Sequence, residues 1–152
     1  MSDYRTILVP YDFSAHSRVA LAEASELATR LDAELHLVHV IQPPTFTYGH
    51  GIYGAAAPPV NMPELREAAL RALREVAQGL PGKAKTHVVE GSGIADMIHE
   101  AAKQVSADLI VMGTHGRTGL AHAFLGSVTE RTLRRAPCPV LTVQAPEEDE
   151  QE

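Results

Sequence analysis

The chain has 152 residues, of which 45% are hydrophobic and 21% charged, a balance that indicates one globular domain with a sizeable core. Its net charge of −6 is uneven, because residues 147–152 carry five of the 19 acids and leave 14 acids against 13 bases before them. This near-neutral body, with 5% aromatic residues and no basic stripe, argues against nucleic-acid binding, and no apolar run approaches the roughly 20 residues that cross a bilayer.

The first predicted strand covers Arg5 to Pro10, because residues 7–9 form an unbroken apolar run typical of strands covered on both faces. Because residues 1–4 lead directly into this strand, no signal peptide is expected. Ser14 is a good N-cap and predicts a helix. The apolar residues of that helix recur at helical spacing: Ala20, Leu21, Ala24, Leu27, Ala28 and Leu31. Glu34 to Ile41 is the second predicted strand.

Residues 43–61 are rich in proline, glycine and alanine, and they predict a mobile loop or lid. The segment contains a formal G-x-G-x-x-G pattern at 49–54. A dinucleotide fingerprint must lie directly between a strand and a helix. Here Ala-Ala-Ala-Pro-Pro at 55–59 prevents a helix from opening, so we reject that interpretation. The next helix begins instead at the capping box of Asn61 and Glu64, with Pro63 in its first turn.

The rest of the chain continues to alternate. A strand is predicted from Thr86 to Val89, a helix then buries an apolar face, and a strand follows from Leu109 to Met112. A last helix begins at Ser127, and a fifth strand covers Val140 to Val143. Five strands and four helices in alternation predict an α/β fold with an open, doubly wound parallel sheet in one domain, residues 1–145. Residues 146–152 are expected to form an acidic, disordered tail.

A glycine-rich stretch joins the fourth strand to the last helix. Gly113, Gly116 and Gly119 follow the strand, and Gly126 precedes Ser127, which forms a capping box with Glu130. Glycines let a backbone approach a ligand closely, and a helix N-terminus offers unpaired N–H groups to an anion such as phosphate. The same residues also suit ordinary turns and an ordinary helix cap. The pattern alone leaves both interpretations open.

The spacing Gly113-x2-Gly116-x9-Gly126-Ser127 resembles, without gaps, the nucleotide loop of the universal stress protein family in its ATP-binding branch. The resemblance extends from the Ile-Leu-Val-Pro-x-Asp-Phe-Ser segment at 7–14 to the Pro-Val-Leu-Thr-Val segment at 139–143. It implies strand order 3-2-1-4-5 and a Rossmann-like, adenine nucleotide alpha hydrolase-like fold. With that order the strand sequence reverses between strands one and four, where ligands of such sheets bind.

The resemblance implies a set of ligand contacts at this end of the sheet. Residues leaving the first strand are Pro10, Tyr11 and Asp12, although Tyr11 replaces the small or polar residue common in the family. Asp12 is expected to hold ribose hydroxyls or Mg²⁺, or else simply to cap the helix beside Ser14. Val40 is expected to contact the adenine with its apolar side chain and its backbone. The ribose and phosphates are assigned to Met112, Gly113, Gly116, Gly126, Ser127 and Val128, and His115 in the same loop is a further candidate contact with the nucleotide. Arg117 either reaches a γ-phosphate or is solvated.

Signals for catalysis are weak. There is no P-loop lysine, and no second carboxylate or base stands at a spacing suited to phosphoryl transfer. The eight histidines show no zinc-binding spacing, so no structural zinc is expected, and His39 is interpreted as a core residue. No catalytic residue is therefore assigned, and any ATPase activity is expected to be slow.

The expected function is that of a dimeric, ATP-dependent sensor or adaptor in the stress response, with Mg²⁺ accompanying the nucleotide. Family members pair their last strand across a two-fold axis, which implies a homodimer through residues 140–143. The flanking prolines and acidic tail could instead protect that edge. Cys138 is the only cysteine and favours a reducing, cytoplasmic setting. The sensor or adaptor would present its nucleotide-dependent surface to an unidentified protein partner. A slow Mg²⁺-dependent ATP hydrolase and a nucleotide-free dimeric interaction module remain the alternatives.

Overall fold

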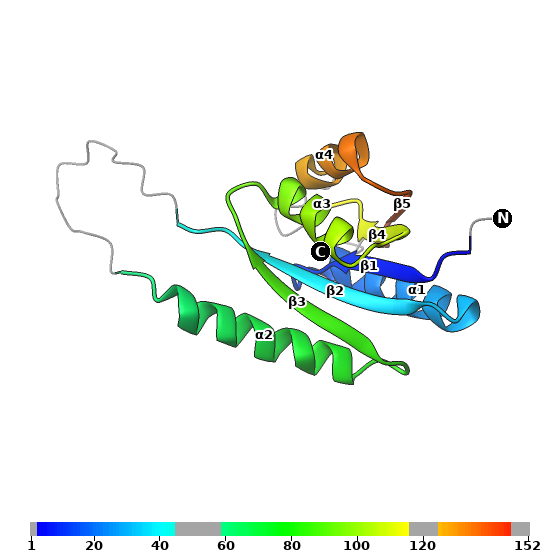
Figure 1. Cartoon of the computed structure of the whole chain (residues 1–152), viewed down its shortest axis with the longest axis horizontal. Coiled ribbons are helices and arrows are strands. Elements are labelled where there is room, and N and C mark those ends of the chain that lie inside the picture. Colours follow the sequence, from blue (N-terminus) through cyan, green and yellow to red (C-terminus); the bar gives the residue numbers. More distant parts are fainter. Residues whose placement is uncertain (1–2, 45–58, 116–124, 147–152) are drawn as a thin grey trace, which may run out of the picture.

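The computed structural model of the chain describes residues 3–44, 59–115 and 125–146 (Figure 1). Most of the predicted lid over 43–61 and of the acidic tail over 146–152 lies outside these residues, and both stay predictions. Gly116, Gly119 and Arg117 also lie outside them. Within the described part of the chain, no helix is long and apolar enough to cross a membrane.

All strands of the described sheet are parallel, and their order is β3-β2-β1-β4-β5, which confirms the predicted order. The strands are β1 (Thr6–Pro10), β2 (Glu34–Ile41), β3 (Ala84–Glu90), β4 (Leu109–Gly113) and β5 (Val140–Val143). β3 is longer than predicted at both ends. It extends from Ala84 to Glu90 because β2 offers it a partner for seven consecutive residues, and pairing of this kind cannot be inferred from the strand's own polar sequence.

In the described part of the chain, four helices connect the strands: α1 (Ala15–Leu31), α2 (Met62–Gln78), α3 (Ile94–Gln104) and α4 (Ser127–Arg135). The predicted caps of α1 and α2 are confirmed, since Ser14 accepts from the Ser17 N–H and Asn61 accepts from the Glu64 N–H. The predicted capping box of α4 is wrong. Gly126 occupies the N-cap without a side-chain bond, Ser127 is already helical, and the Glu130 carboxylate accepts from Arg134 instead.

The sheet is covered on both faces, with α1 and α2 on one side and α3 and α4 on the other (Figure 1). Alternate residues of β1 and β4 enter the two cores: Ile7, Val9, Leu109 and Val111 face α1 and α2, while Leu8, Ile110 and Met112 face α3 and α4. This double coverage explains why residues 7–9 and 109–112 are continuously apolar. The central strands therefore form a rigid base for their carboxyl ends.

Helix α2 offers a test of this packing. Leu73 on its inner face is 0% exposed, whereas Leu65 on the same helix is 42% exposed. We expect Leu73→Ala to lower the free energy of unfolding by about 2–5 kcal/mol, because it removes buried methyl groups and leaves a cavity. Leu65→Ala should change it by less than about 0.5 kcal/mol. Urea denaturation of the two variants checks this, and equal effects would show that α2 does not pack as described.

A second test concerns two histidines on neighbouring strands. His36 of β2 is 5% exposed, and its Nδ1 lies 2.8 Å from Nε2 of His87 on β3. Burial, more than any neighbouring charge, lowers the pKa of His36, and it likewise lowers the pKa of His87. The unfolded chain, with a histidine pKa of about 6.5, then binds more protons than the folded chain at mildly acidic pH.

Stability should consequently fall as the pH drops below about 6.5, the unfolded-state value, toward the lower folded-state pKa values. Urea midpoints recorded between about pH 8 and 5 measure this dependence. His87→Gln removes one of the two titrating groups and should make the decline shallower. A decline of unchanged steepness in that variant would mean that other groups cause it.

Candidate functional site

A cleft with an open volume of about 570 Å³ lies at the carboxyl ends of β1, β2 and β4. β1 leads into α1 on one face of the sheet, and β4 leads towards α4 on the opposite face. The end of the sheet between them is left open, as expected for a doubly wound fold.

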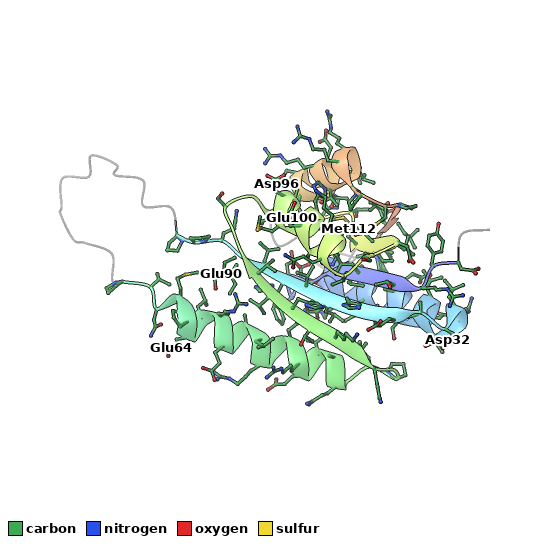
Figure 2. All side chains as sticks on the ribbon, viewed as in Figure 1. Asp32, Glu64, Glu90, Asp96, Glu100 and Met112 are labelled. Carbon is green, nitrogen blue, oxygen red and sulfur yellow. The ribbon has the colours of Figure 1, made fainter. Side chains whose placement is uncertain are left out.

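The wall of the cleft is divided into an apolar part and a polar part. The apolar part is contributed by β2, α3, β4 and α4 through Val38, Val40, Ile94, Ile98, Met112 and Val128. Figure 2 labels Met112, which lies near the carboxyl end of β4, between β1 and the edge strand β5. The polar part contains Asp12, Ser17, His39, His115 and Thr129. Such a cleft suits a ligand with one flat, apolar end and one hydrogen-bonding end.

The structure brings together most of the residues that the sequence analysis assigned to a ligand site. Eight of them line the cleft: Pro10, Tyr11, Asp12, Val40, Met112, Gly113, His115 and Val128. Gly126 and Ser127 lie next to it at the start of α4 but are not among its lining residues. Gly116 and Arg117 fall outside the described part of the chain, so their assignments stay predictions.

The turn after β1 fixes the polar corner of the cleft. The Ser14 N–H donates to Oδ1 of Asp12 at 3.0 Å, and this turn orients the carboxylate, whereas the N-cap of α1 is Ser14 itself. Phe13 between them has a positive φ of 64°, a left-handed conformation that costs energy in a bulky residue. Its ring contacts Tyr11 and His39 edge-on, with both ring centroids 5.1 Å away. These contacts offset the strain and hold the turn in one conformation.

His39 is placed differently from its interpretation as a core residue. It is half-buried in the cleft wall, and its Nδ1 lies 2.8 Å from the Tyr11 carbonyl oxygen. The contact of the imidazole with the Tyr11 carbonyl helps to hold the turn that carries Asp12. Tyr11 itself is buried, and burial is the main reason why the pKa of its phenol is raised, so the phenol stays neutral.

The end of β4 is tied to α4 on one side and packed against α1 on the other. The Thr129 hydroxyl donates to the Gly113 carbonyl at 2.9 Å, and the Gly126 N–H donates to the Thr114 carbonyl at 2.8 Å. A side chain at Gly113 would lie 2.9 Å from both Cβ and the carbonyl oxygen of His16 in the first turn of α1. Gly113 is thus required by a close approach of two elements.

The first turn of α4 supplies the third feature of the site. N–H groups in the first turn of a helix have no partner within the helix, and they favour negative charge. Val128 and Thr129 of this turn line the cleft. An anionic group of a ligand would find donors here, next to the polar corner formed by Asp12.

Six lining residues were missed by the sequence analysis: Ser17, Val38, His39, Ile94, Ile98 and Thr129. Two signals were available. Val38 lies two residues before Val40, so both face the same side of β2, and Ile98 follows Ile94 at helical spacing. Ser17 and Thr129 are buried polar residues inside helices, where no local pattern distinguishes them.

A metal bound here would need ligands from outside the protein. In the described parts of the chain, no group of three or more histidine, cysteine, aspartate or glutamate side chains comes together. Asp12 can supply one carboxylate oxygen ligand. Mg²⁺ is usually held by one or two carboxylates together with substrate phosphates and water, so the residues present fit that ion only alongside a phosphate-bearing ligand.

Comparison with known proteins gives a uniform result. The family model described as universal stress protein family matches residues 3–144. The chain is 36% identical over 149 residues to a universal stress protein of Methanocaldococcus jannaschii, which covers 96% of this chain and 85% of that protein. The solved structure of UspA from Lactobacillus plantarum superposes with a TM-score of 0.71 at 29% identity, covering 94% and 99% of the two chains.

Another similar structure is that of a universal stress protein in complex with cAMP. It superposes with a TM-score of 0.66 at 27% identity and covers 94% of this chain and 98% of that one. The ligand belongs to that protein.

The contact at Gly113 can be tested by adding a methyl group. We expect Gly113→Ala to destabilise the fold by about 1–3 kcal/mol, since the new Cβ meets the backbone of α1, which cannot rotate away. Gly82→Ala is the matched control because its Cβ would meet nothing within 4 Å. Thermal and urea unfolding measure both variants. A Gly113→Ala protein as stable as the control would contradict the close approach of β4 and α1.

Proposed function

This chain belongs to the universal stress protein family. From that membership and from the cleft at β1 and β4, we propose that it binds ATP together with Mg²⁺ and forms a homodimer. We propose further that it acts in the cytoplasm as a nucleotide-dependent sensor or adaptor. The observation that carries the proposal is the division of one cleft into an apolar slot and a polar end beside a helix N-terminus.

Each part of the nucleotide has a matching part of the cleft. Adenine is flat and apolar on its faces, and the slot between Val40 of β2 and Val128 of α4 offers it apolar contact. Asp12 can accept hydrogen bonds from ribose hydroxyls. The phosphates then extend toward the first turn of α4, where N–H groups and the helix dipole favour negative charge. The relative solved with cAMP supports an adenine nucleotide in a cleft of this fold.

Holding the nucleotide suits this cleft better than cleaving it. Phosphoryl transfer needs neutralisation of charge and a positioned nucleophile. Among the lining residues of the described chain there is no lysine or arginine, and Asp12 is engaged with the backbone of Ser14. A slow turnover is therefore proposed at most. Mg²⁺ would neutralise the phosphates with Asp12 as its protein oxygen.

The proposed homodimer rests on the free edge of the sheet. Among the described residues, β5 pairs with β4 on one side only. Leu141 on β5 is exposed, and so is Leu133 on α4. An unpaired strand edge with apolar side chains favours pairing with another strand. A second copy of β5 across a two-fold axis would satisfy both the backbone groups and the leucines. A further protein partner would then read the state of the dimer.

The first experiment is to denature the purified protein and identify any released nucleotide by chromatography and mass spectrometry, followed by thermal unfolding with ATP and Mg²⁺. We expect ATP to raise the melting temperature, because a ligand at about 100 times its Kd stabilises the folded state by about 2.7 kcal/mol. AMP and cAMP, titrated in parallel, report how much the phosphates contribute.

The matched variants are two valine substitutions. Val40→Asp places a charge in the proposed adenine slot and should abolish the ATP-dependent rise, whereas Val60→Asp changes a 44% exposed valine outside the cleft and should preserve it. A wild-type protein that neither releases nucleotide nor responds to ATP would refute nucleotide binding and leave an interaction module. Mg²⁺-dependent hydrolysis above a mock preparation, lost in Asp12→Ala, would instead favour an enzyme.

A further inference from the structure

Two pairs of histidine rings in the described structure have nearly the same centroid separation. The facing nitrogens of one pair are hydrogen-bonded to each other, whereas the other pair contains two buried nitrogens without a hydrogen-bond partner. His36 and His87 have ring centroids 5.1 Å apart and planes inclined by 7°, and their facing nitrogens are bonded to each other. His16 and His115 have ring centroids 5.3 Å apart and planes inclined by 51°. In this second pair, Nδ1 of His16 and Nε2 of His115 are buried and have no hydrogen-bond partner.

Buried polar atoms normally find a partner, so a pair of unpartnered nitrogens in two rings that touch points to a missing ligand. His115 lines the cleft, and His16 does not line it but lies against the His115 ring, so a ligand would reach the pair from the His115 side. The pair exists because Gly113 lets the first turn of α1 approach the end of β4, which brings His16 next to a residue 99 positions later in the chain.

The separation of the rings suits a metal ion. With a Zn–N distance of about 2.0–2.1 Å and the ring centre about 1.1 Å behind the nitrogen, each ring centre would lie about 3.2 Å from the metal. At a tetrahedral angle, two such ring centres are about 5.2 Å apart. The observed separation is 5.3 Å. The near-parallel His36 and His87 rings direct their nitrogens at each other and leave no lone pair for a shared ion.

The neighbour of His115 supports the same ligand. Nδ1 of His115 lies 3.1 Å from the Thr114 hydroxyl. When Nδ1 carries the proton and donates to that oxygen, Nε2 keeps its lone pair. Histidines that bind metals almost always place their second nitrogen in a supporting hydrogen bond of this kind. In that tautomer a phosphate oxygen, itself an acceptor, cannot pair with Nε2. In the opposite tautomer the Thr114 hydroxyl donates to Nδ1 and the Nε2–H would donate to a phosphate, so phosphate is included in the test below.

We propose that His16 and His115 bind a divalent transition-metal ion of the zinc type at the rim of the cleft. The described residues form no group of three metal-binding side chains, so the protein supplies two ligands and leaves the remaining positions to water or to an oxygen of a cleft-bound molecule. Asp12 lines the same cleft and adds negative charge there. The ion requires no nucleotide, so its test is independent of the proposed function.

The test is a calorimetric titration of Zn²⁺ alone into the full-length, tag-free protein after removal of metals by a chelator. We expect saturable binding of one Zn²⁺ per chain. Thr114→Val removes only the supporting hydroxyl and should weaken binding by roughly 10–100-fold. His16→Ala and His115→Ala each remove a ligand and should weaken it more. His87→Ala also removes one imidazole, from the other pair, and should leave the Kd unchanged.

A second measurement covers the case in which a variant fails to fold. In wild-type protein, histidine ring resonances recorded by NMR should shift on addition of Zn²⁺ for His16 and His115 and stay in place for His36 and His87. Absence of binding, equal weakening by His87→Ala, or shifts confined to other rings would overturn the proposal. It would also be overturned if inorganic phosphate, and not Zn²⁺, moved the His16 and His115 resonances.

Discussion

Everything at the carboxyl end of the sheet depends on one constraint: β1 and β4 are neighbours whose chains leave toward opposite faces. Helices cover both faces of the two strands, but they cannot cover the carboxyl end, from which the chain departs toward both faces. The position of the two strand ends is therefore fixed by contacts with the neighbouring helices. The Thr129 hydroxyl and the Gly126 N–H bind the backbone at Gly113 and Thr114, while α1 closes on Gly113 from the other side. The cleft is thus a consequence of topology, and its rigidity comes from a few polar contacts.

The sequence predicted the sheet well because burial on both faces leaves a strong local signature. The apolar runs at 7–9 and 109–112 identify the central strands without any knowledge of their neighbours. The helix caps were less predictable. Ser127 and Glu130 have the spacing of a capping box, but the helix begins one residue earlier than a cap at Ser127 allows, because the chain before it is already tied to Thr114. Here a tertiary contact overrode a local preference.

The candidate site was predictable where it follows the strand ends and unpredictable where distant elements meet. Asp12, Val40 and Met112 lie where the resemblance and the topology place them. Ser17, Ile98 and Thr129 enter the cleft from three helices, and their contribution depends on how each helix is rotated against the sheet. The contact between His16 and His115 is of the same kind, since they lie 99 positions apart in the chain and no spacing rule connects them. Neither the three helical lining residues nor the contact between the two histidines could be found without the structure.

Strand β5 contacts the backbone beside the cleft and also forms one edge of the described sheet. The Thr114 N–H at the cleft donates to the Val143 carbonyl of β5, and the other side of β5 is the free edge of the sheet. A ligand that moved Thr114 would therefore act on the same strand that a second copy would pair with. Free-energy coupling between two binding events is reciprocal. If an occupied cleft strengthened self-association, dissociation of the protein on dilution would weaken its affinity for the ligand by the same factor. Occupancy of the cleft would then depend on the concentration of the protein as well as on that of the ligand.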